Sequence, residues 1–248
     1  MWLSSHPTRS KNVGDTTKAF ARFFGPDQKP DYVWTDNANE YKKTFEKLGY
    51  HYSDTSTPYH HEANGIAEAA VKRVKNGTST TLKQSGLREW WWPEASQCFV
   101  YLRNITDKNT YGRTPHKDRF GVEFSGPIWP FGCQVKIAPH KEEKSKSAST
   151  IHRFGDKTVD GIFVGYVPHA GGAWGKDVLV LKRSTLQYYE FASSCTINRY
   201  VASEVRVIVT DDDQFIFPLR DSTGGTGIIY PGANPHGYPM EGLAWKQP

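Results

Sequence analysis

The first half of the chain alternates between helical and extended hydrophobic patterns. Apolar residues three and four positions apart predict helices over residues 16–24 and 39–48, each followed by a glycine that ends it. Short runs of β-branched and aromatic residues predict strands over residues 30–36 and 50–56. Helices and strands that alternate in this way are typical of an α/β layer.

Two longer helices are predicted next, over residues 65–84 and 92–105. In the first, the positions expected to face a core are Ile66, Ala70, Val74 and Leu82. In the second, the apolar stripe is Ala95, Phe99, Leu102 and Ile105. Core packing of an amphipathic helix explains the second stripe without a functional role. Gly77 lies inside the first helix, where glycine costs about 1 kcal/mol relative to alanine.

The pattern changes after about residue 114. Short β-branched or aromatic runs, separated by glycine, proline and charged residues, occupy positions 131–139, 160–168, 176–183 and 186–191. Such runs predict a small antiparallel barrel or sandwich. The end of the chain is rich in glycine, proline and aspartate, and residues 205–248 are predicted to form a flexible linker or tail.

The composition allows a nucleic-acid partner but does not require one. Among 248 residues, 31 lysines and arginines against 26 aspartates and glutamates give a formal net charge of +5. Cys98, Cys133 and Cys195 lie far apart and predict neither a zinc site nor a disulfide framework. No apolar run is long enough to span a bilayer and no signal-peptide pattern begins the chain, so we expect no membrane partner and a nuclear or cytoplasmic location.

Two acidic residues are candidates for a metal site. Asp36 follows the run VWT at the predicted end of a strand, which is the edge where open α/β sheets usually carry their functional groups. Glu68 lies in the first turns of the helix predicted over residues 65–84. Paired carboxylates can hold Mg²⁺, because this ion prefers hard oxygen ligands. Mg²⁺ held in this way assists in-line displacement at phosphorus. The alternative interpretation of Asp36 is a simple turn residue.

Basic residues accompany Glu68 on the same predicted helix. Lys72 and Lys75 stand four and seven residues after Glu68 and therefore share its face, and Arg73 is adjacent. A solvated face of Glu–Lys ion pairs explains this pattern without function. The functional interpretation is a carboxylate at a metal beside cations that bind a phosphate backbone.

Several motifs, in order, resemble one known family. The run TDNANEY followed by STPYHHEANGIAEAAVKRVKNGTSTTL is similar to the second half of the integrase catalytic core of copia-type long-terminal-repeat retrotransposons. The family's pattern there is S/T-D-N-G-x-E-F, then S-x-P-Y-x-P-x-x-N-G-V-A-E-R-x-N-R-T-L. The segments WPEASQCFVYLRN, RTPHKDRFG, FGCQVKI and DGIFVGY also resemble the family, so the likeness covers about residues 1–200.

This resemblance implies a DDE-type recombinase with an RNase H-like fold. Such enzymes trim the ends of the element's DNA and join the new 3′-hydroxyls to target DNA, using Mg²⁺ or Mn²⁺. The implied organisation is a truncated RNase H-like core over residues 1–112, an SH3-type small barrel over 113–204 and a linker or tail over 205–248. The implied partners are DNA, both element ends and target, and further copies of the chain in a homo-oligomer.

The family motif also implies roles for individual residues. The catalytic residues and metal ligands are Asp36, as the second carboxylate, and Glu68, as the third. Lys72 and Lys75 match positions that contact DNA ends, and Arg73 joins them as a DNA-binding candidate by its adjacency. The residues that support the site are Asn37, Glu40, Asn64 and Gly65.

Some positions depart from the family pattern. Ala38 replaces the glycine after T-D-N, Ala69 replaces the arginine after the catalytic glutamate, and no residue matches the first carboxylate. We therefore expect a fragment or degenerate copy of an integrase, with little or no strand transfer by this chain alone. Two alternatives stay open: a non-catalytic nucleic-acid-binding remnant, and a protein-interaction module built on the small barrel.

Overall fold

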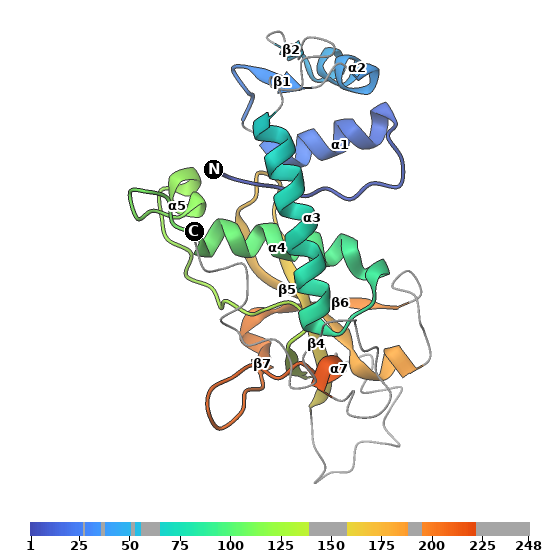
Figure 1. Ribbon diagram of the computed structural model, residues 1–248, viewed down its shortest axis with the longest axis vertical. Helices are drawn as coiled ribbons and strands as arrows, with labels where there is room; N and C mark the ends of the chain where they lie inside the picture. The colour runs from blue at the N-terminus through green and yellow to red at the C-terminus, as the bar shows by residue number, and fades with distance from the viewer. Residues whose placement is uncertain are drawn as a thin grey trace.

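A long helix, α3 (Gly65–Ser85), runs along the molecule and joins its two ends (Figure 1). The computed structural model describes residues 1–26, 28–35, 38–50, 53–55, 65–138, 158–187 and 195–221. The other helices in these ranges are α1 (Val13–Phe24), α2 (Asn39–Leu48), α4 (Trp92–Thr106), α5 (Pro115–Phe120) and α7 (Pro218–Asp221). The strands are β1 (Val33–Thr35), β2 (Ser53–Thr55), β3 (Gln134–Ile137), β4 (Val159–Pro168), β5 (Trp174–Lys182), β6 (Ile197–Val201) and β7 (Val205–Val207).

The four helices predicted from the hydrophobic pattern are confirmed as α1, α2, α3 and α4. Helix α1 begins at Val13, before the predicted start, because the Asn12 side chain accepts a hydrogen bond of 2.7 Å from the backbone N–H of Asp15 and caps the helix. Helix α2 ends at Gly49, whose φ of 67° lies in the left-handed region that glycine favours. These ends are set by local side-chain and backbone chemistry.

One end of the molecule consists of α1, α2 and the short strands β1 and β2, which pair in parallel (Figure 1). Aromatic rings hold the two helices together: the Phe20 ring meets those of Phe45 and Tyr41 edge to face, with centroids 5.2 and 6.0 Å apart. Helix α1 itself has no buried residue. This end therefore has a small core and depends on its contacts with the rest of the chain.

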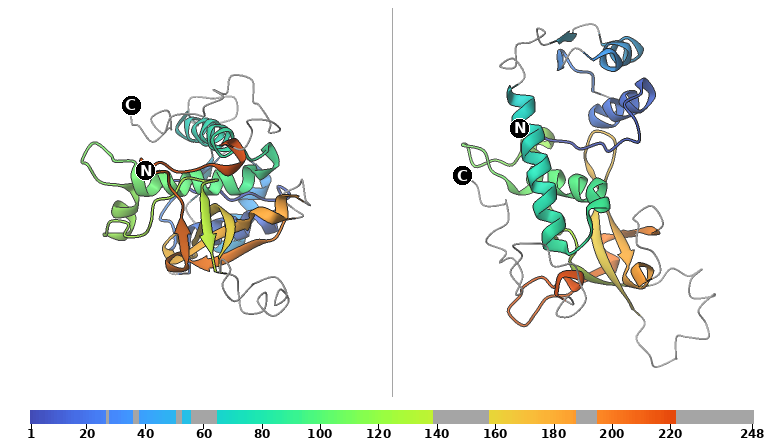
Figure 2. Two further views of the ribbon diagram at one scale, coloured as in Figure 1. Left: turned by 90° about the horizontal axis from the view of Figure 1, so that it is seen from below. Right: turned by 45° about the vertical axis from the view of Figure 1, so that its right-hand side comes forward.

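The other end is a five-stranded antiparallel sheet with the strand order β6-β5-β4-β3-β7. Helix α4 packs against β4, and α3 packs on α4, so the helices form successive layers over the sheet (Figure 2). A single cluster of buried apolar side chains joins these layers, and its largest members include Trp91, Leu102, Phe131, Ile137, Ile162, Phe163 and Phe217. The main core of the protein lies between α4 and the sheet.

The fold is thus mixed α/β, with an antiparallel sheet in the second half as predicted. The runs 131–139, 160–168 and 176–183 contain β3, β4 and β5. The run 186–191 begins instead in a 3₁₀ helix, Arg183–Gln187, and its later residues lie outside the described ranges. The RNase H-like and SH3-type identities, and the division at residues 112 and 204, stay predictions.

Residues 205–221 belong to the folded unit, although the composition places them in a linker or tail. Strand β7 pairs with β3, and Phe217 is only 1% exposed. Helix α7 packs against α3. The sequence pattern did not predict this strand, because β7 is only three residues long and its partner β3 lies far earlier in the chain. The rest of the predicted tail, 222–248, lies outside the described residues.

Candidate nucleic-acid interface

Helix α3 has an exposed half and a buried half. Its buried residues all lie between Gly77 and Ser85, in the turns that α4 crosses (Figure 1). The earlier turns extend past that crossing, and Glu68 is exposed there. Ile66 is 80% exposed, so the prediction that it faces a core is wrong. The periodicity of α3 is regular, but among the described residues only its later turns are buried against other elements.

A pocket of about 930 Å³ lies beside the exposed half of α3. Glu68, Lys72 and Lys75 line it from α3, in keeping with their helical spacing. Its other walls come from the N-terminal segment that precedes α1, from α1 itself, and from β1 and the start of α2. Glu40, in the first turn of α2, lines the pocket as well. The pocket therefore collects several of the residues that the motifs single out.

Arg73 lies on a different side of α3 from Lys72. It is not among the described residues that line the pocket, and its charge acts instead on Asp107, which follows α4. Burial raises the pKa of Asp107, and the charges of Arg103 and Arg73 partly offset that rise. Neighbours in a helix point about 100° apart, so adjacency to Lys72 does not bring Arg73 to the pocket.

The end of β1 forms part of the pocket wall. Thr35 lines the pocket and directly precedes Asp36 in the chain. Asp36, Asn37 and Asn64 lie outside the described residues, so their predicted roles stay predictions. Gly65 begins α3 and is exposed. Of the two predicted catalytic carboxylates, the structure describes Glu68.

The donors at the pocket include several oxygens that suit a hard cation. The carboxylates of Glu40 and Glu68 line it, and the Thr35 hydroxyl oxygen is buried with no hydrogen-bond partner among the described residues. Oxygen donors of this kind are the ligands of Mg²⁺ and Mn²⁺ in proteins. In the ranges that the structure describes, no three His, Cys, Asp or Glu side chains are grouped to hold a metal. The predicted metal site includes Asp36, which lies outside the described residues.

The N-terminal segment, residues 4–11, forms a wall of the pocket that the family motifs do not indicate. The residues that line the pocket at every second position are Ser4, His6, Thr8 and Ser10. Alternate side chains of an extended chain point the same way. The alternation of small polar residues and histidine in SSHPTRS is the signal by which the sequence could have revealed this wall.

His6 is partly buried in this wall. Its Nε2 atom lies 2.8 Å from the hydroxyl oxygen of Ser4. Burial lowers the pKa of His6 from its ordinary value of 6.5, and the positive charge of Arg22 lowers it further. The imidazole is therefore neutral at neutral pH, and it does not contribute a positive charge to the pocket.

The pocket lining combines charged and aromatic side chains. Its charged members are Lys11, Lys72, Lys75, Glu40 and Glu68. Its aromatic members are Phe20, Trp34 and Tyr41. Cations and aromatic rings together are the groups with which proteins hold the phosphates and bases of nucleic acids.

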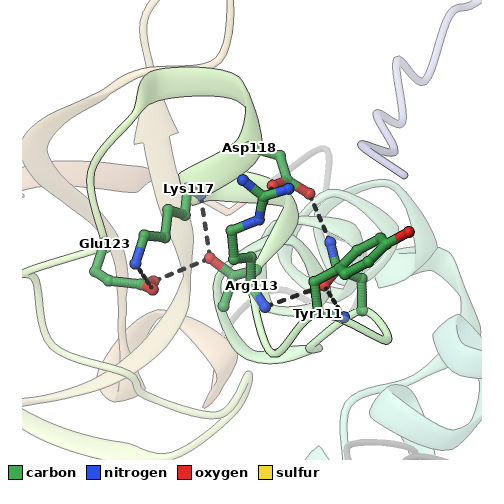
Figure 3. Close-up of polar contacts among 7 residues, drawn as sticks. Tyr111, Arg113, Lys117, Asp118 and Glu123 are labelled. Atoms are coloured by element: carbon green, nitrogen blue, oxygen red, sulfur yellow. Dashed lines mark hydrogen bonds and ion pairs between the residues drawn. The ribbon is translucent and has the colours of Figure 1, made fainter.

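A second group of polar contacts surrounds α5 (Figure 3). Arg113 Nε lies 3.2 Å from Asp118 Oδ1, and Lys117 Nζ lies 3.2 Å from Glu123 Oε1. The Thr114 hydroxyl donates to Glu123 and accepts from the Lys117 backbone N–H, both at 3.1 Å, so it caps α5. The hydrogen bond from Lys117 lowers the pKa of Glu123. These contacts within the chain are sufficient to hold the turn around α5, so they do not indicate a ligand site.

The chain matches no protein-family model and no curated protein sequence. The resemblance to copia-type integrases therefore rests on the sequence motifs and stays a prediction. Within the described ranges, no helix has the length and apolar character needed to cross a membrane.

Proposed function

We propose that the chain binds the phosphate backbone of DNA at the pocket beside α3, as part of a copia-type integrase. The observation that carries the proposal is that Glu68, Lys72 and Lys75 line one pocket together with Thr35, the residue before Asp36. Lysines beside a carboxylate allow phosphate binding next to a cation-binding group. In the sequence, Thr35 is separated from these residues of α3 by helix α2 and strand β2.

The architecture is compatible with the proposed family. Parallel strands β1 and β2 with helices α1 and α2 support an α/β core in the first part of the chain. The antiparallel sheet formed by β3 to β7, which packs against α4, supports a β-rich part in the second half of the chain. We assign these parts to the RNase H-like core and to the SH3-type small barrel.

Asp36 and Glu68 are the proposed ligands of Mg²⁺ or Mn²⁺. When bound, the ion would stabilise charge on the oxygens at a reacting phosphorus. The chain's own contribution would be to hold the phosphate with Lys72 and Lys75 and to keep the carboxylate of Glu68 near it. Two protein carboxylates completed by water bind such an ion weakly, so we expect little or no strand transfer by this chain alone.

DNA binding is tested by fluorescence anisotropy with a short labelled duplex over a range of salt concentrations. The double variant Lys72→Gln/Lys75→Gln is expected to weaken binding about tenfold and to reduce the slope of log K against log salt by about 2, because each lysine–phosphate contact releases counterions. Lys83→Gln is the matched control, since Lys83 is exposed on the same helix but does not line the pocket. Equal effects of the double variant and the control would contradict the proposal.

Metal binding is tested separately by electron paramagnetic resonance of Mn²⁺ titrated with the protein. Asp36→Asn and Glu68→Gln are each expected to weaken Mn²⁺ binding severalfold, since each removes one ligand charge. Glu89→Gln is the control, because Glu89 lies in the 3₁₀ helix before α4, outside the pocket lining. Mn²⁺ binding that is unaffected by the first two variants would overturn the metal assignment while leaving DNA binding in place.

A second candidate is a non-catalytic nucleic-acid-binding function. Lys11, from the N-terminal segment, lines the pocket together with Lys72 and Lys75, and these described lysines favour phosphate binding whether or not a metal is present. DNA affinity that is independent of both Mn²⁺ and Asp36→Asn would support this candidate over the integrase, because only the integrase proposal places a metal ion beside the bound phosphate.

A further inference from the structure

The N-terminal segment, residues 4–11, is held by α4 so that alternate side chains face the pocket. Leu3 donates its N–H to Asn104 Oδ1 at 3.0 Å, and its carbonyl accepts from Asn104 Nδ2 at 2.7 Å. The hydroxyl oxygens of Ser5 and Ser96 lie 2.9 Å apart. Positions 3 and 5 are thus fastened to α4, while the even positions 4 to 10 line the pocket, as an extended chain requires.

We propose that this pocket binds a single, unpaired strand of nucleic acid. The phosphate backbone lies between the N-terminal segment and α3, and a base stacks on the aromatic side chains of the pocket. The inference rests on the proposed function and narrows its ligand from DNA in general to single-stranded nucleic acid.

Basic groups on both walls suit one phosphate backbone. Lys11 belongs to the N-terminal segment, whereas Lys72 and Lys75 belong to α3, and all three are exposed and line the pocket. Thr8 adds a hydroxyl group from the same wall as Lys11. Lysines and hydroxyl groups are common partners of phosphate oxygens, so a strand between the walls is contacted from two sides.

Aromatic side chains supply a surface for a base. Trp34 is 46% exposed and lines the pocket with Phe20 and Tyr41. Both faces of a paired base are covered by its neighbours in a duplex, so stacking on a protein side chain requires an unpaired base. This combination selects a single strand over a duplex.

The two carboxylates of the pocket restrict where the backbone lies. Glu40 and Glu68 are in the first turns of α2 and α3 and repel phosphate oxygens there. The phosphates are therefore expected to follow Lys72 and Lys75 further along α3, with Lys11 contacting them from the N-terminal segment. A divalent cation bound at Glu68, as proposed above, would reduce this repulsion, and Mg²⁺ is expected to strengthen strand binding.

Fluorescence anisotropy with three labelled probes tests the inference: a single-stranded DNA of roughly 12 nucleotides, the RNA of the same sequence, and the DNA duplex. We expect the DNA strand, the RNA strand or both to bind about tenfold more tightly than the duplex. Trp34→Leu is expected to weaken single-strand binding about tenfold and duplex binding less than twofold, because it removes base stacking. Trp34→Phe keeps a ring and is expected to retain most of the affinity.

Matched control variants at exposed positions outside the pocket show whether binding depends on the pocket. Trp92 is 48% exposed, close to the value for Trp34, but it lies at the start of α4 and does not line the pocket, so Trp92→Leu should leave binding unchanged. Lys11→Gln is expected to reduce the single-strand salt slope by about 0.7. Lys18→Gln, at an exposed position of α1 outside the pocket lining, should not change the slope.

The outcomes distinguish this inference from the proposed function. Equal affinity for single strand and duplex, or equal effects of Trp34→Leu and Trp92→Leu, would overturn the single-strand inference. If duplex binding still depended on Lys72 and Lys75, the proposed function would survive that result. If no probe depended on Lys72 and Lys75, both would fail.

Discussion

Arg119 and Gly171 bond to each other, and both bond to the end of α1. The Arg119 Nε–H donates to the backbone carbonyl of Gly171 at 2.9 Å. The same guanidinium donates from Nη2 to the carbonyl of Phe23, near the end of α1, at 2.8 Å. Gly171 in turn donates its N–H to the Arg22 carbonyl at 2.9 Å. Its φ of 89° in the β4–β5 turn is one that glycine favours. These bonds fasten α1, and with it a wall of the pocket, to the main core.

Arg119→Lys is expected to lower the free energy of unfolding by about 2 kcal/mol. Lysine keeps the charge but cannot donate in the planar geometry of the guanidinium, nor stack as Arg119 does at 5.2 and 5.0 Å from the ring centroids of Trp2 and Phe23. Urea denaturation measures the change. Arg113→Lys is the control, because its ion pair with Asp118 is largely exposed and should be worth less than about 1 kcal/mol. Equal losses in the two variants would refute the role of Arg119.

Gly77→Ala is expected to destabilise the protein by about 1 to 3 kcal/mol, even though alanine favours helices over glycine. A Cβ atom at position 77 would overlap the ring of Phe99, which is 2% exposed where α3 crosses α4. Gly65→Ala is the matched control, since a Cβ there meets no atom of the described residues within 4 Å. Thermal denaturation of both variants should show a lower midpoint for Gly77→Ala and an unchanged or higher midpoint for Gly65→Ala.

Tyr166→Phe is expected to cost about 1 to 3 kcal/mol of stability. The Tyr166 hydroxyl accepts from the Trp129 N–H at 2.9 Å and donates to the Pro127 carbonyl at 3.0 Å, so its loss leaves two backbone groups without this partner. The neighbouring Tyr101 provides a control, because its buried hydroxyl has no partner among the described residues. Tyr101→Phe should therefore be neutral or stabilising in the same denaturation experiment. A similar cost for both variants would contradict this account.

The pH dependence of stability is expected to include a contribution from His6. Its pKa in the folded protein is below the ordinary value of 6.5, so the unfolded chain binds the proton first. The contribution is complete above pH 6.5 and is lost as the pH falls from 6.5 toward the folded pKa. Denaturation between about pH 7.5 and 5 should show a smaller fall for His6→Gln than for the parent chain.

The same pH series with Arg22→Gln tests the cause. Removal of the Arg22 charge should raise the His6 pKa part of the way toward 6.5, because burial is the larger cause of the lowered value. An NMR titration of the His6 ring protons measures that pKa directly. A His6 pKa at or above 6.5 in the parent chain would be incompatible with the burial seen here.

The positions of the first four helices follow from local chemistry. The Asn12 cap, the glycine at the end of α2 and the spacing of apolar residues all act within a few residues of one another. For the same reason, Glu68, Lys72 and Lys75 could be placed on one face of α3 from their spacing alone. The positions of residues around a helix axis follow from the helix geometry and do not depend on the rest of the fold.

Burial and the pocket depend on contacts between distant parts of the chain. Ile66 fits the apolar stripe of α3 and yet is exposed, because α4 crosses only the later turns of that helix. Strand β7 is too short to be recognised until it pairs with β3. The N-terminal wall of the pocket exists because Asn104 and Ser96 on α4 hold residues 3 and 5. A periodic pattern specifies which residues share a face, but what covers that face is set by segments far away in the sequence.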